Sequence, residues 1–182
     1  MRALKLLAAA LGVAYGMITL ALSASPLYLV RGPVWGAVSL VTYRLWAFGS
    51  PFYSPALDTA SVLSLSVLLS ATLNIAASAW LMIEGGDEAV RAEAHAGAAL
   101  SSLVSIGVLR GLKRLIGGEL AGIAGSFDHV TSAGHVILGR VIVEEFPPAS
   151  VFFGSAYLIL AAALVAVSLA HLVQVYAGLR AH

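Results

Sequence analysis

Two histidines, His95 and His171, are the residues of this chain best placed to do chemistry. Each lies in a long apolar segment, and ionisable side chains inside such segments are often functional. If both segments are helices, the two side chains lie at similar depths near one end. Imidazoles from two helices can ligate a haem b, so His95 and His171 are the candidate haem or metal ligands. Their commoner role is hydrogen-bonded packing, and we expect no cofactor, with haem b as the alternative.

A second group of ionisable residues occupies the most polar part of the chain. Asp128, His129 and His135 are followed by Glu144 and Glu145. The six-residue spacing of the two histidines does not place both on one face of a helix, so only a loop could assemble a metal site. We therefore expect these residues to be solvated groups at a membrane surface.

Other classes of site are excluded by the residues themselves. The chain has no cysteine, which removes disulfides, thiolate metal sites and cysteine nucleophiles. Motifs typical of zinc proteases, serine hydrolases and nucleotide-binding proteins are absent from the sequence. The net charge is +1, which gives no extended basic face for nucleic acid. We expect a protein that is not an enzyme and does not bind nucleic acid directly.

The composition predicts an integral membrane protein. Hydrophobic residues make up 60% of the chain and charged residues 10%, against roughly 25% charged residues in soluble domains. We expect an all-α, polytopic fold with a single membrane domain over residues 1–182. Five apolar segments are long enough to cross a bilayer, and a polar region at 117–150 is expected to form an amphipathic segment at its surface. The five expected spans are residues 3–25, 27–48, 58–83, 94–114 and 151–179.

Two of these spans have alternatives. Residues 1–25 fit either a signal peptide or a retained first helix, and the small-residue stripe Ala8, Gly12, Gly16 favours a retained helix with a packing face. Residues 27–48 contain Arg31, Gly32-Pro33 and Arg44. They fit either a second spanning helix or a shorter amphipathic helix at the interface, which would leave four spans. We favour the spanning helix.

The expected third and fourth spans form a hairpin with matched faces. Ser66, Ser70, Asn74 and Ser78 recur every four residues and share one face of the first helix. Gly97, Ser101 and Ser105 recur in the same way on the second helix. Small and polar residues allow close approach and hydrogen bonds between helices in lipid, so both stripes are predicted to be packing surfaces. A polar pathway along the first stripe is the alternative.

Basic residues set the expected orientation in the cell membrane. Arg2 and Lys5 place the N-terminus in the cytoplasm, and the cluster Arg110, Lys113, Arg114 follows the fourth span. Because cytoplasmic loops carry an excess of basic residues, five spans with the N-terminus inside and the C-terminus outside is the consistent arrangement.

The hairpin resembles a known group of membrane proteins. Residues 57–109 contain an apolar helix, a turn with the sequence Glu84-Gly85-Gly86-Asp87-Glu88, and a second apolar helix rich in small residues. This pattern is similar to that of the type IV secretion and conjugative-pilin group, including archaeal DNA-import components. The resemblance covers about 50 of 182 residues, and the acidic turn departs from the group's basic one. It implies a subunit that packs helix on helix.

Three functions follow from these patterns. The first is a non-enzymatic structural or pore-forming subunit of a multi-component membrane assembly, such as a secretion or DNA-transfer apparatus. Its partners would be the lipid bilayer and other membrane subunits or further copies of the chain. The second is a haem- or quinone-binding membrane anchor of a respiratory complex, using His95 and His171. The third is the membrane subunit of a small-solute transporter, indicated by the segment Gly32-Pro33-Val34-Trp35-Gly36.

Overall fold

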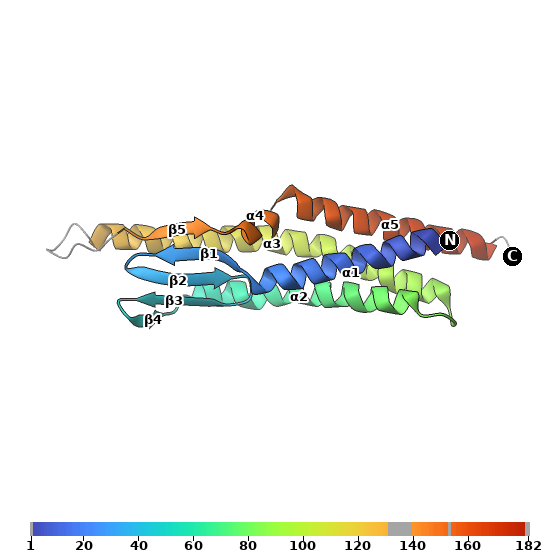
Figure 1. Cartoon of the computed structure of the whole chain (residues 1–182), viewed down its shortest axis with the longest axis horizontal. Coiled ribbons are helices and arrows are strands. Elements are labelled where there is room, and N and C mark those ends of the chain that lie inside the picture. The colour runs from blue at the N-terminus through green and yellow to red at the C-terminus, as the bar shows by residue number, and fades with distance from the viewer. Residues whose placement is uncertain (1, 131–139, 153, 181–182) are drawn as a thin grey trace. The chain divides into compact units, whose positions relative to one another are not determined.

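The computed structural model describes residues 2–130, 140–152 and 154–180. These residues group into two compact units (Figure 1). The helical unit consists of residues 1–21, 66–107 and 155–182, and the sheet unit of residues 22–65 and 108–154. The chain was expected to form one membrane domain. The helices are α1 (Arg2–Ala24), α2 (Pro55–Met82), α3 (Glu88–Val130), α4 (Pro147–Phe152) and α5 (Ser155–Arg180).

Within the described residues, four helices are long and apolar enough to cross a membrane. They comprise all of α1, α2 and α5, and the segment Glu88–Ser126 of α3. The expected helical character of the chain and its membrane-protein composition are therefore confirmed at this level. The same four helices overlap the expected spans at residues 3–25, 58–83, 94–114 and 151–179, although α5 begins only at Ser155.

The expected helix at 27–48 is wrong, and with it the all-α fold class. This segment forms strands β1 (Pro26–Arg31), β2 (Val34–Ser39) and β3 (Tyr43–Ala47), followed by β4 (Ser50–Phe52). Gly32, with a φ of 118°, sits in the turn between β1 and β2, and Phe48 and Gly49 both have positive φ between β3 and β4. Two central residues with positive φ form the tight hairpin turn that matches strand twist. The segment is long and apolar enough for a span, but its turns break it every five or six residues.

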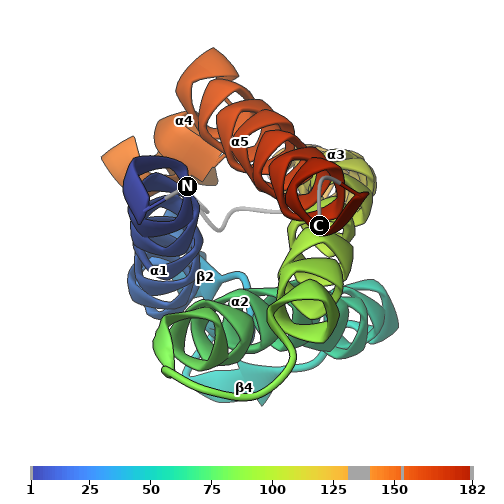
Figure 2. The ribbon, with the colours of Figure 1, turned by 90° about the vertical axis from the view of Figure 1, so that its right-hand side faces the viewer.

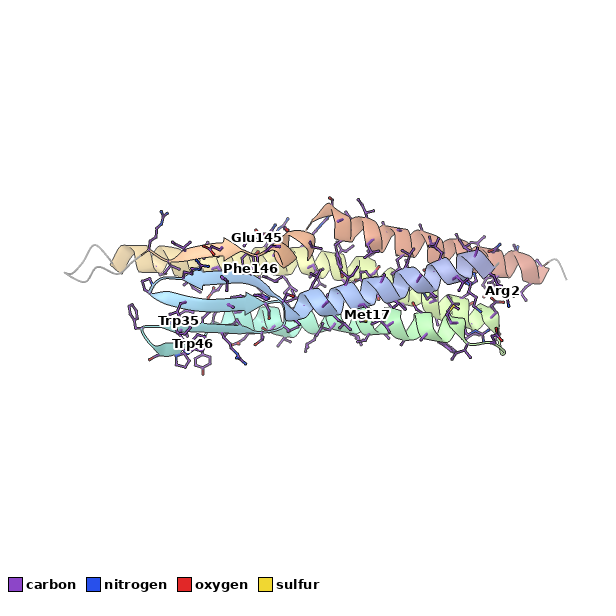
Figure 3. The ribbon with its side chains drawn as sticks, viewed as in Figure 1. Arg2, Met17, Trp35, Trp46, Glu145 and Phe146 are labelled. Atoms are coloured by element: carbon purple, nitrogen blue, oxygen red, sulfur yellow. The ribbon has the colours of Figure 1, made fainter. Side chains whose placement is uncertain are left out.

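The five strands form one antiparallel sheet in the order β4-β3-β2-β1-β5, where β5 is Ile142–Glu145. One face buries Val34, Val38 and Leu45, as the alternation of a half-buried strand requires. On the other face Trp35 and Trp46 are register partners and stack with ring centroids 4.6 Å apart (Figure 3). The sheet therefore has a buried apolar face and, on its other face, an aromatic pair in which Trp35 is half exposed.

The expected amphipathic region at 117–150 is replaced largely by regular structure. Helix α3 begins at Glu88, where Asp87 Oδ1 accepts a hydrogen bond from the Ala89 amide at 2.8 Å, and it continues to Val130. It starts earlier and ends later than the expected helix at 94–114, because the basic cluster does not interrupt it. The rest of the region contains β5 and the start of α4.

The helical unit brings both ends of the chain to one end of the bundle (Figure 2). Lys5 near the start of α1 forms an ion pair with Glu88 at the start of α3, with 3.7 Å between Nζ and Oε1. Tyr176 near the end of α5 hydrogen-bonds to Glu93. The start of α1 and the end of α5 therefore lie together beside the turn between α2 and α3.

Candidate functional site

A buried row of polar side chains on α2 forms one wall of the candidate site. Ser70, Asn74 and Ser78 are all buried, whereas Ser66 at the same spacing is exposed. The predicted four-residue stripe is therefore a buried face over only three of its members. Because α2 is apolar elsewhere, burying this face inside the unit leaves Leu and Val side chains on the outside.

Helix α3 supplies the groups that pair with this row. Ser70 Oγ and Ser101 Oγ lie 2.8 Å apart, and Asn74 Nδ2 donates to the Ala98 carbonyl at 2.9 Å and to the Ser70 carbonyl at 2.8 Å. Ser78 Oγ lies 3.1 Å from His95 Nε2. Three successive turns of α2 therefore each make a polar contact with α3.

The other two predicted residues of α3 have different roles. Ser105 is buried, and its hydroxyl donates to the Ser101 carbonyl of its own helix at 3.1 Å. Gly97 is exposed and lines an apolar groove of about 450 Å³ between α2 and α3. Leu73, Trp80 and small residues line the groove, so a ligand there would find an apolar concave surface with few polar groups.

His95 is held tightly in the interior of the helical unit. It is 1% exposed, and α1 approaches it at Gly12. A Cβ added to Gly12 would lie 2.1 Å from Ser78 Oγ and 3.1 Å from His95 Nε2. The missing side chain of Gly12 therefore leaves the space that the Ser78–His95 pair occupies, and the Nε2 side of the ring is already filled.

His171 on α5 is also buried in the helical unit, where it is 1% exposed. Among the described residues, neither ring nitrogen of His171 has a hydrogen-bond partner, nor has His95 Nδ1. Gln174 Oε1, one turn further along α5, is also buried and unpaired in this part of the chain.

Charged groups gather at the end of the helical unit where α1 and α3 begin. Lys5 of α1 and Glu88 of α3 form an ion pair there. Arg91 is buried one turn before His95, and its guanidinium donates to the Gly85 carbonyl in the turn between α2 and α3. The positive charge of Arg91 is thus directed toward the turn.

A separate cavity of about 390 Å³ lies in the sheet unit, between α3 and strands β1 and β5. Lys113, Glu145 and Tyr28 contribute its polar lining. Burial of Tyr28, and secondarily the charge of Glu145, raise the pKa of the Tyr28 hydroxyl above its ordinary value. The phenol is therefore a neutral hydrogen-bonding group at neutral pH.

The polar residues of the segment 128–145 were expected to be solvated groups, with a metal site as the less favoured alternative. Glu144 pairs with Arg31 at 3.2 Å on neighbouring strands. The side chains of Asp128 and His129, and His135 altogether, lie outside the described residues. Within the described part of the chain, no three His, Cys, Asp or Glu side chains are grouped so that they could hold a metal ion.

Sequence reasoning did not single out Arg91 and Gln174, and it assigned Gly12 only to the packing face of the first helix. Arg91 lies four residues before His95 and Gln174 three after His171, so both share a helix face with a histidine. Those spacings were the sequence pattern from which Arg91 and Gln174 could have been predicted to lie near the histidines. Comparisons with protein families, with curated proteins and with solved structures found no match to this chain.

Proposed function

We propose that this protein is a non-enzymatic, multi-pass membrane protein that serves as a structural or pore-forming subunit of a larger membrane assembly. In this proposal the four apolar helices cross the bilayer, and the subunit associates first with further copies of itself. A secretion or DNA-transfer apparatus is an assembly of this kind, as the resemblance of residues 57–109 suggests. The proposal rests chiefly on one feature of α3.

That feature is an exposed glycine face on α3, formed by Gly111, Gly118, Gly122 and Gly125. At 3.6 residues per turn these positions fall within about 60° of one another around the helix axis. A Cβ added to any of the four would meet no atom of the described residues within 4 Å. Packing within the described chain therefore gives no reason for glycine at these positions.

Glycine in the interior of a helix is costly. Each glycine destabilises a helix by about 1 kcal/mol relative to alanine, so four of them cost α3 on the order of 4 kcal/mol. Faces of small residues separated by three positions allow two helix backbones to approach closely. A second copy of α3 would fit such a face because like faces of this kind pair with each other. Association of copies would offset the cost that the isolated chain bears.

The test uses substitutions whose effects on stability and on assembly are expected to have opposite signs. In Gly118→Ala with Gly122→Ala, the isolated chain should gain about 1 kcal/mol per substitution, whereas the added methyl groups should separate the packed helices. We expect native mass spectrometry from mild detergent to show several copies for the wild type and single chains for the double variant. Thermal unfolding of the separated chains should occur at a higher temperature for the double variant.

The matched control is Gly117→Ala. Gly117 lies on the same helix about 110° away from the centre of the glycine face, and a Cβ there also meets no described atom within 4 Å. This variant should gain stability and keep the copy number of the wild type. A wild type that is a single chain, or a double variant that keeps its copies, would contradict the proposal.

A second test concerns membrane crossing. Four spans place the N- and C-terminal ends on the same side of the membrane, whereas five place them on opposite sides. Because the chain has no cysteine, Arg2→Cys and Arg180→Cys each introduce a single thiol. We expect an impermeant maleimide to label both variants from the same side of sealed vesicles. Labelling from opposite sides would restore the arrangement with an odd number of spans.

A further inference from the structure

We propose that the cavity of the sheet unit binds a small zwitterion, whose ammonium group pairs with Glu145 and whose anionic group pairs with Lys113. Free α-amino acids and the phosphoethanolamine headgroup of a phospholipid share this chemistry. The site goes beyond the proposed function, which makes no use of the cavity. All the residues that line it belong to the sheet unit.

One wall of the cavity is a face of the sheet. Val141, Val143 and Glu145 line it at alternate positions, two in β5 and one just before it, as side chains on one face of a strand do. Tyr28 of β1 lies directly opposite Glu145 in the antiparallel pairing, so the Cβ atoms of the two residues are about 5 Å apart. Tyr28 is 6% exposed. The sheet therefore places a buried phenol next to a carboxylate at the cavity wall.

The other wall is one face of α3. Lys113, Gly117, Ala121 and Ala124 line the cavity, and their positions fall within about 80° of one another around the helix axis. Lys113 is the only long side chain among these four, and the three small residues leave room beside it. A Cβ added to Gly117 would meet no described atom within 4 Å, which agrees with free space in front of this face. The strand period and the helix period thus place the cavity independently of each other.

The lining of the cavity selects a ligand with two opposite charges. The volume of about 390 Å³ falls within the range of roughly 300–1,000 Å³ that is typical of sites for small organic molecules. The Lys113 ammonium offers only donors and the ionised Glu145 carboxylate only acceptors, whereas the Tyr28 hydroxyl can do either. A ligand with a single charge would be attracted by one of the two charged side chains and repelled by the other. A zwitterion can form a charge-assisted hydrogen bond with each of them.

The neighbouring carboxylate, Glu144, does not belong to the site. Because side chains alternate along a strand, Glu144 lies on the other face of the sheet, where it pairs with Arg31 of β1 at 3.2 Å. It is not among the described residues that line the cavity. Two adjacent residues of the same charge therefore have different surroundings, and only Glu145 is placed to bind the ligand.

The cavity and the glycine face of α3 are separate surfaces. The face that lines the cavity is centred about 120° around the helix axis from the face formed by Gly111, Gly118, Gly122 and Gly125. Binding of a zwitterion and association of copies can therefore be tested independently of each other.

The test titrates the full chain, purified in detergent, by isothermal titration calorimetry. L-Leucine represents the free amino acid, and glycerophosphoethanolamine represents the lipid headgroup. We expect at least one of these probes to bind with one molecule per chain, and the probe that binds identifies the source of the ligand. 4-Methylpentanoate and 3-methylbutylamine each lack one charged group of leucine, and glycerol 3-phosphate and ethanolamine divide the second probe in the same way. These analogues should bind at least about tenfold more weakly.

Three variants locate the bound molecule. Lys113→Gln and Glu145→Gln each remove one charge, and each should weaken binding at least about tenfold. Gly117→Leu keeps both charges but places a side chain in the space of the cavity, so it should abolish binding. Leucine favours a helix more than glycine does, so thermal unfolding of this variant should not occur at a lower temperature than in the wild type. Loss of the ligand site is thereby distinguished from loss of the fold.

The matched control is Glu144→Gln, which removes the same charge from the adjacent position on the other face of the sheet. This variant should bind like the wild type. The proposal is overturned if neither probe binds, as direct pairing of Lys113 with Glu145 across the cavity would give. Analogues with a single charge that bind as tightly as the zwitterions would overturn it, and so would equal binding by the Lys113 and Glu145 variants.

Discussion

Replacing Gly36 by alanine is expected to unfold the sheet unit. Gly36 lies in β2 opposite Leu45 of β3, and its φ is 144°. An added Cβ would lie 1.9 Å from the Arg44 carbonyl oxygen, and the two next nearest atoms, at 2.9 and 3.0 Å, are also backbone. Backbone atoms can yield only if β2 and β3 separate. The expected loss is about 3 kcal/mol or more, the sum of a steric overlap and a conformation that L-residues rarely adopt.

The two stacked tryptophans of the sheet report this loss. Trp80→Phe in α2 removes the third tryptophan of the chain, so that fluorescence then comes from Trp35 and Trp46 alone. In that background, Gly36→Ala should shift the fluorescence transition to a lower denaturant concentration or abolish it. Gly49→Asn is the matched control, because Gly49 has a φ of 81° with open space around it and asparagine tolerates this conformation. Equal transitions for the two variants would show that the close approach at Gly36 is not required.

The apolar helices could be predicted from the sequence because their signal is local. Helices α1, α2 and α5 are long apolar runs, and length with composition is enough to identify such segments. The same criterion failed at residues 27–48, where the apolar content of three short strands adds up to the length of a span. The decisive features there were conformational. Gly36 at positive φ and the turn at Phe48 and Gly49 have no strong signature in the sequence.

Contacts between segments that are far apart in the chain could not be predicted from the sequence either. Strand β5 pairs with β1, more than 100 residues away, and four apolar or acidic residues give no periodicity from which to predict that pairing. His95 and His171 could be singled out as ionisable residues in apolar segments. Their surroundings could not, because the approach of α1 at Gly12 and the unpaired atoms on α5 depend on how four helices pack. The chemistry of the site was therefore predictable by residue type but not by geometry.

Replacing Gly16 by leucine is expected to separate α1 from α2. A Cβ added to Gly16 would lie 2.4 Å from Ile75 Cγ1 and 2.7 Å from the Ala71 carbonyl oxygen. The isoleucine could change rotamer, but the carbonyl belongs to the backbone of α2 and can move only with the helix. Leucine adds three further carbon atoms beyond that Cβ. Overpacking of a tight contact costs typically 1–3 kcal/mol, and the upper end, about 3 kcal/mol, is expected here because one neighbour is backbone.

The stability lost by overpacking in Gly16→Leu should exceed the stability gained from the higher helix propensity of leucine. The variant Gly97→Leu distinguishes the two effects. Gly97 is also a helical glycine, but an added Cβ meets no described atom within 4 Å, so its replacement should raise stability by about 1 kcal/mol. Thermal unfolding in detergent should therefore move in opposite directions for the two variants. Unchanged stability in Gly16→Leu would mean that α1 does not pack on α2 through its small-residue face.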